Sequence, residues 1–245
     1  MAKPLFNACS NENETIVKYL VEHGANINEK NKCGETPLFN ACSNGNETLV
    51  KYLVEPETNV NKKRKIGETP LFNTYKNGKK AVTKYLVVHK SDINMKNYVG
   101  ETPLFNACKN GNEAVVKYLV DQGFDINIEN CDGETPLFNT FNTCRSGNEA
   151  IVKYLIDIGT NINKTEYRGS TPLFDACRAG NIAIVKYLIK HGANINKEKR
   201  DGETPLFTAY KSGNDEIAIY LTKHGAYKKK SNREFEKFFT RYTHF

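Results

Sequence analysis

Residues 100–108 read Gly-Glu-Thr-Pro-Leu-Phe-Asn-Ala-Cys, and residues 116–119 continue with Val-Lys-Tyr-Leu. The tripeptide Pro-Leu-Phe in this stretch occurs seven times in the 245-residue chain. Successive copies are 33 residues apart, with one spacing of 36, and begin at Pro4, Pro37, Pro70, Pro103, Pro136, Pro172 and Pro205. Self-similarity at this period is typical of a tandem array of small structural repeats.

Each copy contains the signals for two short helices. In the second copy, Thr36 is placed to supply an N-cap hydroxyl, and Pro37 takes the first helical position, where a missing N–H costs nothing. Gly45 then predicts a left-handed stop, and Asn46 a second N-cap. The apolar positions of the two helices recur at helical spacing: Leu38, Ala41 and Cys42 in the first, and Leu49, Val50, Leu53 and Val54 in the second.

Polar residues connect each second helix to the next copy through an extended finger, in which Gly34 suits a tight turn at positive φ. Neither helix has enough apolar face to be stable alone, so the units must stack to share a core. The sequence therefore predicts an all-α solenoid of helix–turn–helix units with extended finger loops.

These residues resemble the ankyrin repeat family over positions 1–226. The approximate units are 1–33, 34–66, 67–99, 100–132, 133–168, 169–201 and 202–226. Two departures recur in every copy: Phe follows Thr-Pro-Leu where the family usually has His, and Tyr precedes the Leu of the second helix where the family usually has another Leu. We interpret both as aromatic packing between repeats.

Two regions depart from the repeat. The fifth unit holds three extra residues, and the spacing of Leu137, Phe141 and Cys144 predicts a first helix lengthened by nearly a turn. Residues 227–245 lie beyond the repeats. Their aromatic residues at helical spacing, with basic residues between them, predict a basic amphipathic capping helix, and membrane-surface binding is the alternative for this segment.

The net charge of +7 is concentrated in two segments, because residues 60–90 carry +8, residues 223–245 carry +5 and the remainder carries about −6. Such patches favour local docking of a partner. Residues 62–65 (Lys-Lys-Arg-Lys) are consistent with a nuclear import signal, a polyanion contact or a solvated charge run.

The sequence contains no pattern of a catalytic, cofactor or metal site. The histidines His23, His89, His191 and His224 recur at one position near a helix C-terminus, which indicates a structural role. Cys9, Cys42, Cys108 and Cys177 share an inward position too widely spaced for disulfides or one zinc ion, whereas Cys33 and Cys131 fall on fingers. No hydrophobic signal segment follows Met1, so we expect a cytoplasmic protein, with the nucleus as the alternative location, and neither enzymatic activity nor a cofactor.

The resemblance implies a protein–protein interaction scaffold that binds through finger tips and the exposed face of the first helices. The candidate finger-tip residues are Ile66, Tyr98, Val99, Tyr167 and Arg168. A second candidate set is a row of cations that follows the first-helix Cys position in five successive units: Lys76, Lys109, Arg145, Arg178 and Lys211.

We expect this row to engage an acidic segment of a protein partner. Two alternatives remain at this stage, namely nucleic-acid or polyanion binding through the basic regions and a targeting fragment of a larger multidomain protein. The chain is expected to be a monomer or part of a longer array.

Overall fold

The structure, a computed structural model, describes residues 2–54, 58–75, 80–89, 91–141 and 148–227. The chain divides into two compact units, unit 1 (Met1–Cys131) and unit 2 (Asp132–Phe245), each of which is described by itself. Within the described residues every regular element is a helix, which confirms the all-α class. No described helix has the length and apolar character needed to cross a membrane.

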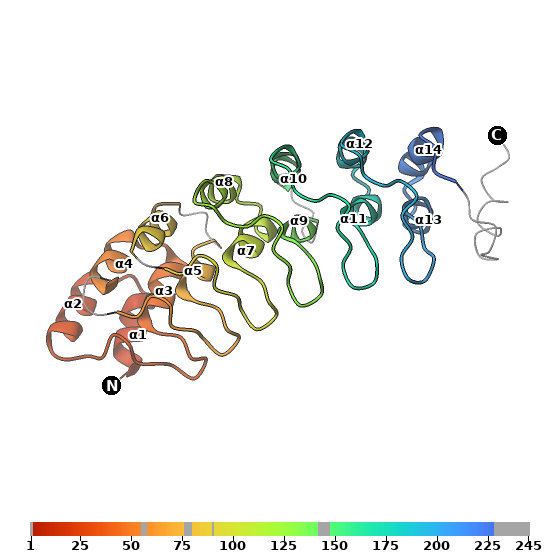
Figure 1. Cartoon of the computed structure of the whole chain (residues 1–245). Coiled ribbons are helices and arrows are strands. Elements are labelled where there is room, and N and C mark those ends of the chain that lie inside the picture. The colour runs from red at the N-terminus through yellow and green to blue at the C-terminus, as the bar shows by residue number, and fades with distance from the viewer. Residues whose placement is uncertain (1, 55–57, 76–79, 90, 142–147, 228–245) are drawn as a thin grey trace. The chain divides into compact units, whose positions relative to one another are not determined.

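Unit 1 contains four helix pairs, coloured red to green in Figure 1. The first helix of each pair packs on the first helix of the next, and the second helices form a parallel layer (Figure 1). We call these the inner and outer helices. The pairs are α1 (Ala2–Ser10) with α2 (Glu14–Glu22), α3 (Pro37–Asn44) with α4 (Glu47–Val54), α5 (Pro70–Asn73) with α6 (Lys80–Val88), and α7 (Pro103–Lys109) with α8 (Glu113–Asp121).

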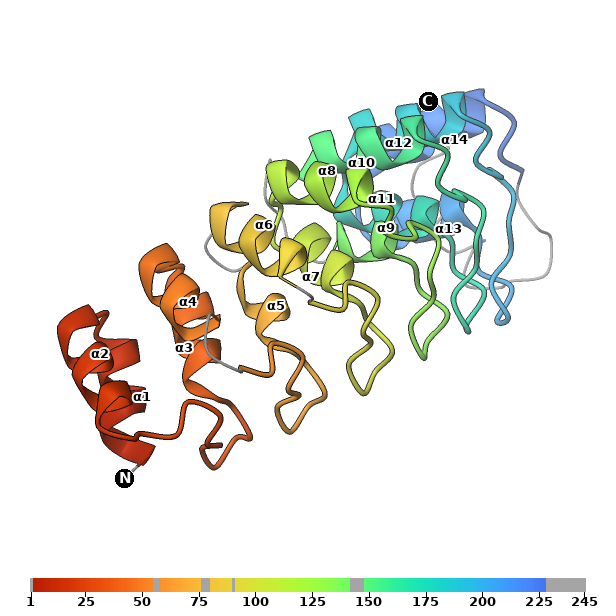
Figure 2. The same ribbon diagram turned by 60° about the vertical axis from the view of Figure 1, so that its left-hand side comes forward.

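The described residues of unit 2 repeat this arrangement with three pairs. In both units the finger loops project beyond the inner helices (Figure 2). Inner helix α11 packs against α9 and α13, while outer helix α12 packs against α10 and α14. The pairs are α9 (Pro136–Asn139) with α10 (Asn148–Asp157), α11 (Pro172–Ala179) with α12 (Ile182–Lys190), and α13 (Pro205–Lys211) with α14 (Asp215–Lys223).

The inner helices after α1 begin where the sequence predicts, with Thr at the N-cap and Pro in the first turn. The predicted role of the Thr hydroxyl is nevertheless wrong in all but one of these helices. The Phe39 N–H donates to the backbone carbonyl of Thr36 at 2.9 Å, and the Thr36 hydroxyl makes no capping hydrogen bond; α5, α7, α9 and α11 begin in the same way. In α13 the Thr204 carbonyl accepts from Thr208, and the Phe207 N–H uses the Thr204 hydroxyl at 3.3 Å.

The prediction that the first helix of the fifth unit is lengthened is also wrong, because α9 ends at Asn139. The Thr140 hydroxyl donates to the Leu137 carbonyl at 2.6 Å, and the Phe141 N–H turns back to the Phe138 carbonyl at 3.2 Å in a tighter, 3₁₀-type bond. Helix α5 is equally short, with Thr74 donating to Leu71. Cys144 lies outside the described residues, as do Lys76, Arg145 and residues 228–245.

The core consists of one apolar layer between the inner and outer helices of each unit. Leu, Phe and the repeated Cys of the inner helices are buried there, which confirms that Cys9, Cys42, Cys108 and Cys177 act as small apolar groups. Burial raises the pKa of the Cys9 and Cys177 thiols to about 12. Cys33 and Cys131 are exposed on fingers as expected.

Candidate partner-binding surface

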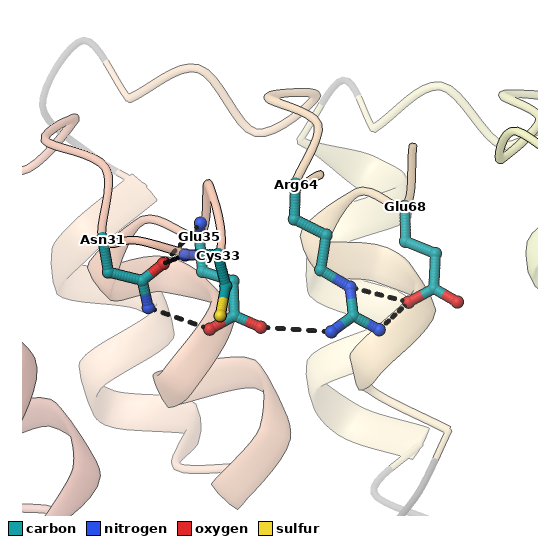
Figure 3. A network of polar contacts seen from close by, with 5 residues as sticks. All are labelled: Asn31, Cys33, Glu35, Arg64 and Glu68. Atoms are coloured by element: carbon teal, nitrogen blue, oxygen red, sulfur yellow. Dashed lines mark hydrogen bonds and ion pairs between the residues drawn. The ribbon is translucent and has the colours of Figure 1, made fainter. Parts of the chain in front are cut away.

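The finger between the first two repeats is closed by one asparagine and one glutamate. Asn31 Oδ1 accepts hydrogen bonds from the backbone N–H groups of Cys33 and Glu35, at 2.8 and 3.0 Å. Asn31 Nδ2 donates to Glu35 Oε2 at 3.0 Å (Figure 3). Asn97 and Glu101 repeat the arrangement two fingers later. The loop shape is therefore fixed by its own side chains.

In the second finger, Arg64 stands where these neighbours have asparagine. Arg64 Nε donates to Glu68 Oε2 at 2.9 Å, and Nη1 donates to Glu35 Oε1 at 3.1 Å, so this side chain joins two fingers (Figure 3). The side chains of Arg64, Glu35 and Glu68 are only 21%, 20% and 11% exposed, respectively. Ion pairs shielded in this way are screened less by salt than surface pairs.

Lysines add a second series of contacts between fingers of unit 1. The Nζ atoms of Lys30, Lys63 and Lys96 each donate to a backbone carbonyl 33 residues further along, at 3.2, 3.0 and 3.1 Å. Lys62 Nζ donates to the Asn28 carbonyl at 2.8 Å. Three side chains of the basic run 62–65 are thus bound to neighbouring fingers. This favours a structural role for the run over a polyanion contact.

The finger tips are connected by backbone hydrogen bonds. In unit 1 the Tyr98 N–H donates to the Ile66 carbonyl at 3.2 Å, and the Cys131 N–H donates to the Val99 carbonyl at 2.9 Å. The Tyr98 ring lies so close to Gly67 that a Cβ there would stand 2.6 Å from Tyr98 Cδ1, and Gly67 has a φ of +83°. Only glycine suits both conditions. Each tip therefore presents its side chains from a fixed backbone.

Three candidate residues share this part of unit 1 and form what we call the apolar tip cluster (Ile66, Tyr98 and Val99). Their exposed fractions are 51%, 69% and 53%, respectively. In unit 2, Tyr167 is 50% exposed, and the guanidinium of Arg168 lies 5.3 Å from the centre of its ring. All five predicted tip residues are therefore exposed.

The predicted cation row has three described members, all of them exposed. Lys109 is exposed at the end of α7 in unit 1. In unit 2, Arg178 Nη1 donates to Asp175 Oδ1 at 2.5 Å, while Lys211 Nζ lies 4.0 Å from Glu203 Oε1 and its side chain is 68% exposed. Acidic neighbours thus accompany the two cations of unit 2.

Sequence reasoning did not find a cavity of about 480 Å³ in unit 2, which is lined by the fingers before α9, α11 and α13 and by residues of α9 and α11. Asp175 and Ser170 belong to its lining. The available signal was that both residues break the repeat, because Asp replaces the Asn of other inner helices and Ser replaces the Glu that precedes Thr-Pro.

The repeated histidines are bound to their own helices. The Nδ1 atoms of His23, His89, His191 and His224 lie 2.7–2.8 Å from the carbonyl of the tyrosine four residues earlier, and each ring packs against that tyrosine. Among the described residues, no group of three or more His, Cys, Asp or Glu side chains is arranged to hold a metal ion.

Models of ankyrin repeats match nearly the whole chain. The model described as "Ankyrin repeats (3 copies)" matches residues 49–130, 71–165 and 140–232, and "Ankyrin repeats (many copies)" matches residues 5–54. The chain belongs to the ankyrin repeat family. Ankyrin repeats are generally protein–protein interaction modules, and the family is typically non-enzymatic.

The fold is also similar to a solved ankyrin repeat structure. The crystal structure of the human ASB11 ankyrin repeat domain superposes with a TM-score of 0.79 at 25% sequence identity, over 89% of this chain and 97% of that chain. A comparison with curated protein sequences gave no match.

Proposed function

We propose that this ankyrin repeat protein is a non-enzymatic scaffold that binds a protein partner through its finger tips and the exposed faces of its inner helices. The apolar tip cluster carries this proposal. Its large apolar side chains are exposed on a backbone held by hydrogen bonds, so binding costs little ordering of the loops. Exposed aromatic residues of this kind are frequent energetic centres of protein interfaces.

The cations Lys109, Arg178 and Lys211, with Lys76 and Arg145 at the equivalent sequence positions, extend the proposed surface along the inner helices. The exposure of Lys109, Arg178 and Lys211 supports contact with an acidic segment of the partner. Nucleic-acid binding is the less favoured function, because Lys62, Lys63 and Arg64 already contact neighbouring fingers.

The tip cluster is tested by capturing partners from an extract of the source cell, identifying them by mass spectrometry and measuring the affinity of the purified pair. Tyr98→Ala should weaken binding by about tenfold or more, which is the usual effect of removing a central aromatic anchor. Ile66→Ser should weaken binding in the same direction.

Val88→Ala is the matched control, since Val88 is 73% exposed on outer helix α6 of the same unit. This variant should bind as the unaltered chain does. Partner affinity that is insensitive to Tyr98 and Ile66, or equally sensitive to Val88, would remove the tip cluster from the binding surface.

A further inference from the structure

The cavity of unit 2 lies beside linked sequence changes at the junction of the fifth and sixth repeats. Glu166 stands where other fingers have Asn31, Arg64 or Asn97, and its carboxylate accepts the backbone N–H groups of Arg168 and Ser170, both at 2.8 Å. A glutamate four residues later, as in those fingers, would place a second carboxylate beside Glu166. Ser170 occurs there instead, and its shorter side chain leaves space in front of α11.

The lining of this cavity is acidic. It carries six carboxylates and three cations, and each cation already has a partner. Arg178 is bound to Asp175, Lys199 to Glu203, and Arg168 Nε donates to the Tyr167 hydroxyl at 2.8 Å. The surplus of negative charge in this open, concave site favours a cationic occupant.

One lining carboxylate is incompletely compensated. The Asp175 side chain is only 19% exposed, and burial raises the pKa of this carboxyl although Arg178 lowers it in part. Removing one charge of a shielded pair from water is costly unless hydrogen bonds satisfy the remaining lone pairs. A positively charged donor in the cavity would add to the compensation that Arg178 gives.

We propose that this cavity receives the side chain of an arginine or lysine residue of a protein partner. The guanidinium or ammonium group donates to Asp175, and the exposed ring of Tyr167 provides an apolar wall for the methylene stem. The inference rests on the proposed function and adds a specific requirement: the partner carries a basic residue that docks on unit 2.

The cavity can be tested without the partner. N-acetyl-arginine methylamide and N-acetyl-lysine methylamide are titrated into the ¹⁵N-labelled full chain, with the neutral N-acetyl-citrulline methylamide as the matched probe. At least one cationic probe should shift the amide resonances of Tyr167, Ser170 and Asp175 with millimolar affinity, and the citrulline probe should not. Asp175→Asn should weaken the cationic probe about tenfold, since a charge-assisted hydrogen bond is lost.

Asp175→Asn is expected to fold, because Asn40, Asn73, Asn106 and Asn139 occupy the equivalent position. Glu216→Gln removes one negative charge from exposed α14 of the same unit and should leave affinity unchanged. Equal binding of citrulline, silent cavity resonances, or equal effects of the two variants would each overturn the inference. The two proposals can fail separately. If the cationic probe binds but the tip variants do not alter partner affinity, the proposed tip surface is refuted and the inference about the cavity stands.

Discussion

Thr102 and Thr204 occupy equivalent positions in two repeats, yet their hydroxyl groups have different environments. Both side chains are buried. The Thr204 hydroxyl accepts from the Phe207 N–H, whereas the Thr102 hydroxyl has no partner among the described residues, because the Phe105 N–H donates to the Thr102 carbonyl. The repeated threonine therefore does not make the same hydrogen bond in every repeat.

Valine has nearly the shape of threonine but lacks the hydroxyl group. Substitution by valine therefore tests the contribution of each hydroxyl to stability. Thr204→Val should lower the free energy of unfolding by about 1 kcal/mol, because a helix cap is lost. Thr102→Val should leave that free energy unchanged or raise it by up to about 1 kcal/mol, because a buried unpaired hydroxyl is removed. Urea unfolding followed by circular dichroism measures both, and equal losses would contradict the assignment.

The elements show which features follow from sequence periodicity and which do not. The 33-residue repeat predicts where the inner helices begin, since Thr-Pro marks each start. It does not predict the short helices α5 and α9, because a single hydroxyl, of Thr74 or Thr140, binds a carbonyl three residues back. The Glu35–Arg64 contact was also not predicted, since it depends on the spacing of two fingers rather than on either finger alone.

The candidate surface likewise has features that the sequence predicts and features that it does not. Exposure of Tyr98 and Ile66 was predicted from their place at finger tips, where copies differ in sequence. The cavity beside Asp175 was not predicted, because Glu166, Ser170 and Asp175 each break the repeat but the sequence does not show that their side chains line one site. Side-chain volume and charge at a shared site are set by packing, which periodicity does not encode.

Substitutions of Arg64 test how much its contacts with Glu35 and Glu68 stabilise the finger loops. Arg64→Met should lower the free energy of unfolding by about 2 kcal/mol, because Glu35 and Glu68 keep their burial and lose their shared cation. Arg64→Asn should cost clearly less, since Asn31 and Asn97 show that asparagine closes a finger with its glutamate. Urea unfolding compares the two variants, and equal costs would show that the asparagine geometry does not transfer.

The whole molecule combines two compact units that carry different local charge near the inner helices. The fingers of unit 1 contain lysines bound to carbonyls and an apolar tip cluster, whereas unit 2 contains an acidic cavity. In repeat proteins stability is close to a sum over repeats and their neighbours, so surface residues vary with little effect on the fold. A chain of this kind can therefore present different chemistry to a partner in each unit.

The cation row predicts how partner binding responds to charge and salt. The double variant Lys109→Glu and Lys211→Glu should weaken association by about tenfold or more, mainly through the association rate, because these exposed cations steer an acidic segment. Lys84→Glu with Lys186→Glu reverses the same number of charges on outer helices α6 and α12 of the same two units and should have little effect. At about 1 M salt, where the Debye length is about 3 Å, the difference between the two double variants should largely vanish.

Surface plasmon resonance with the identified partner measures both the association rate and the dissociation rate. Equal effects of the two double variants would contradict the row, and tight binding of duplex DNA that depends on Lys109 and Lys211 would favour polyanion binding instead.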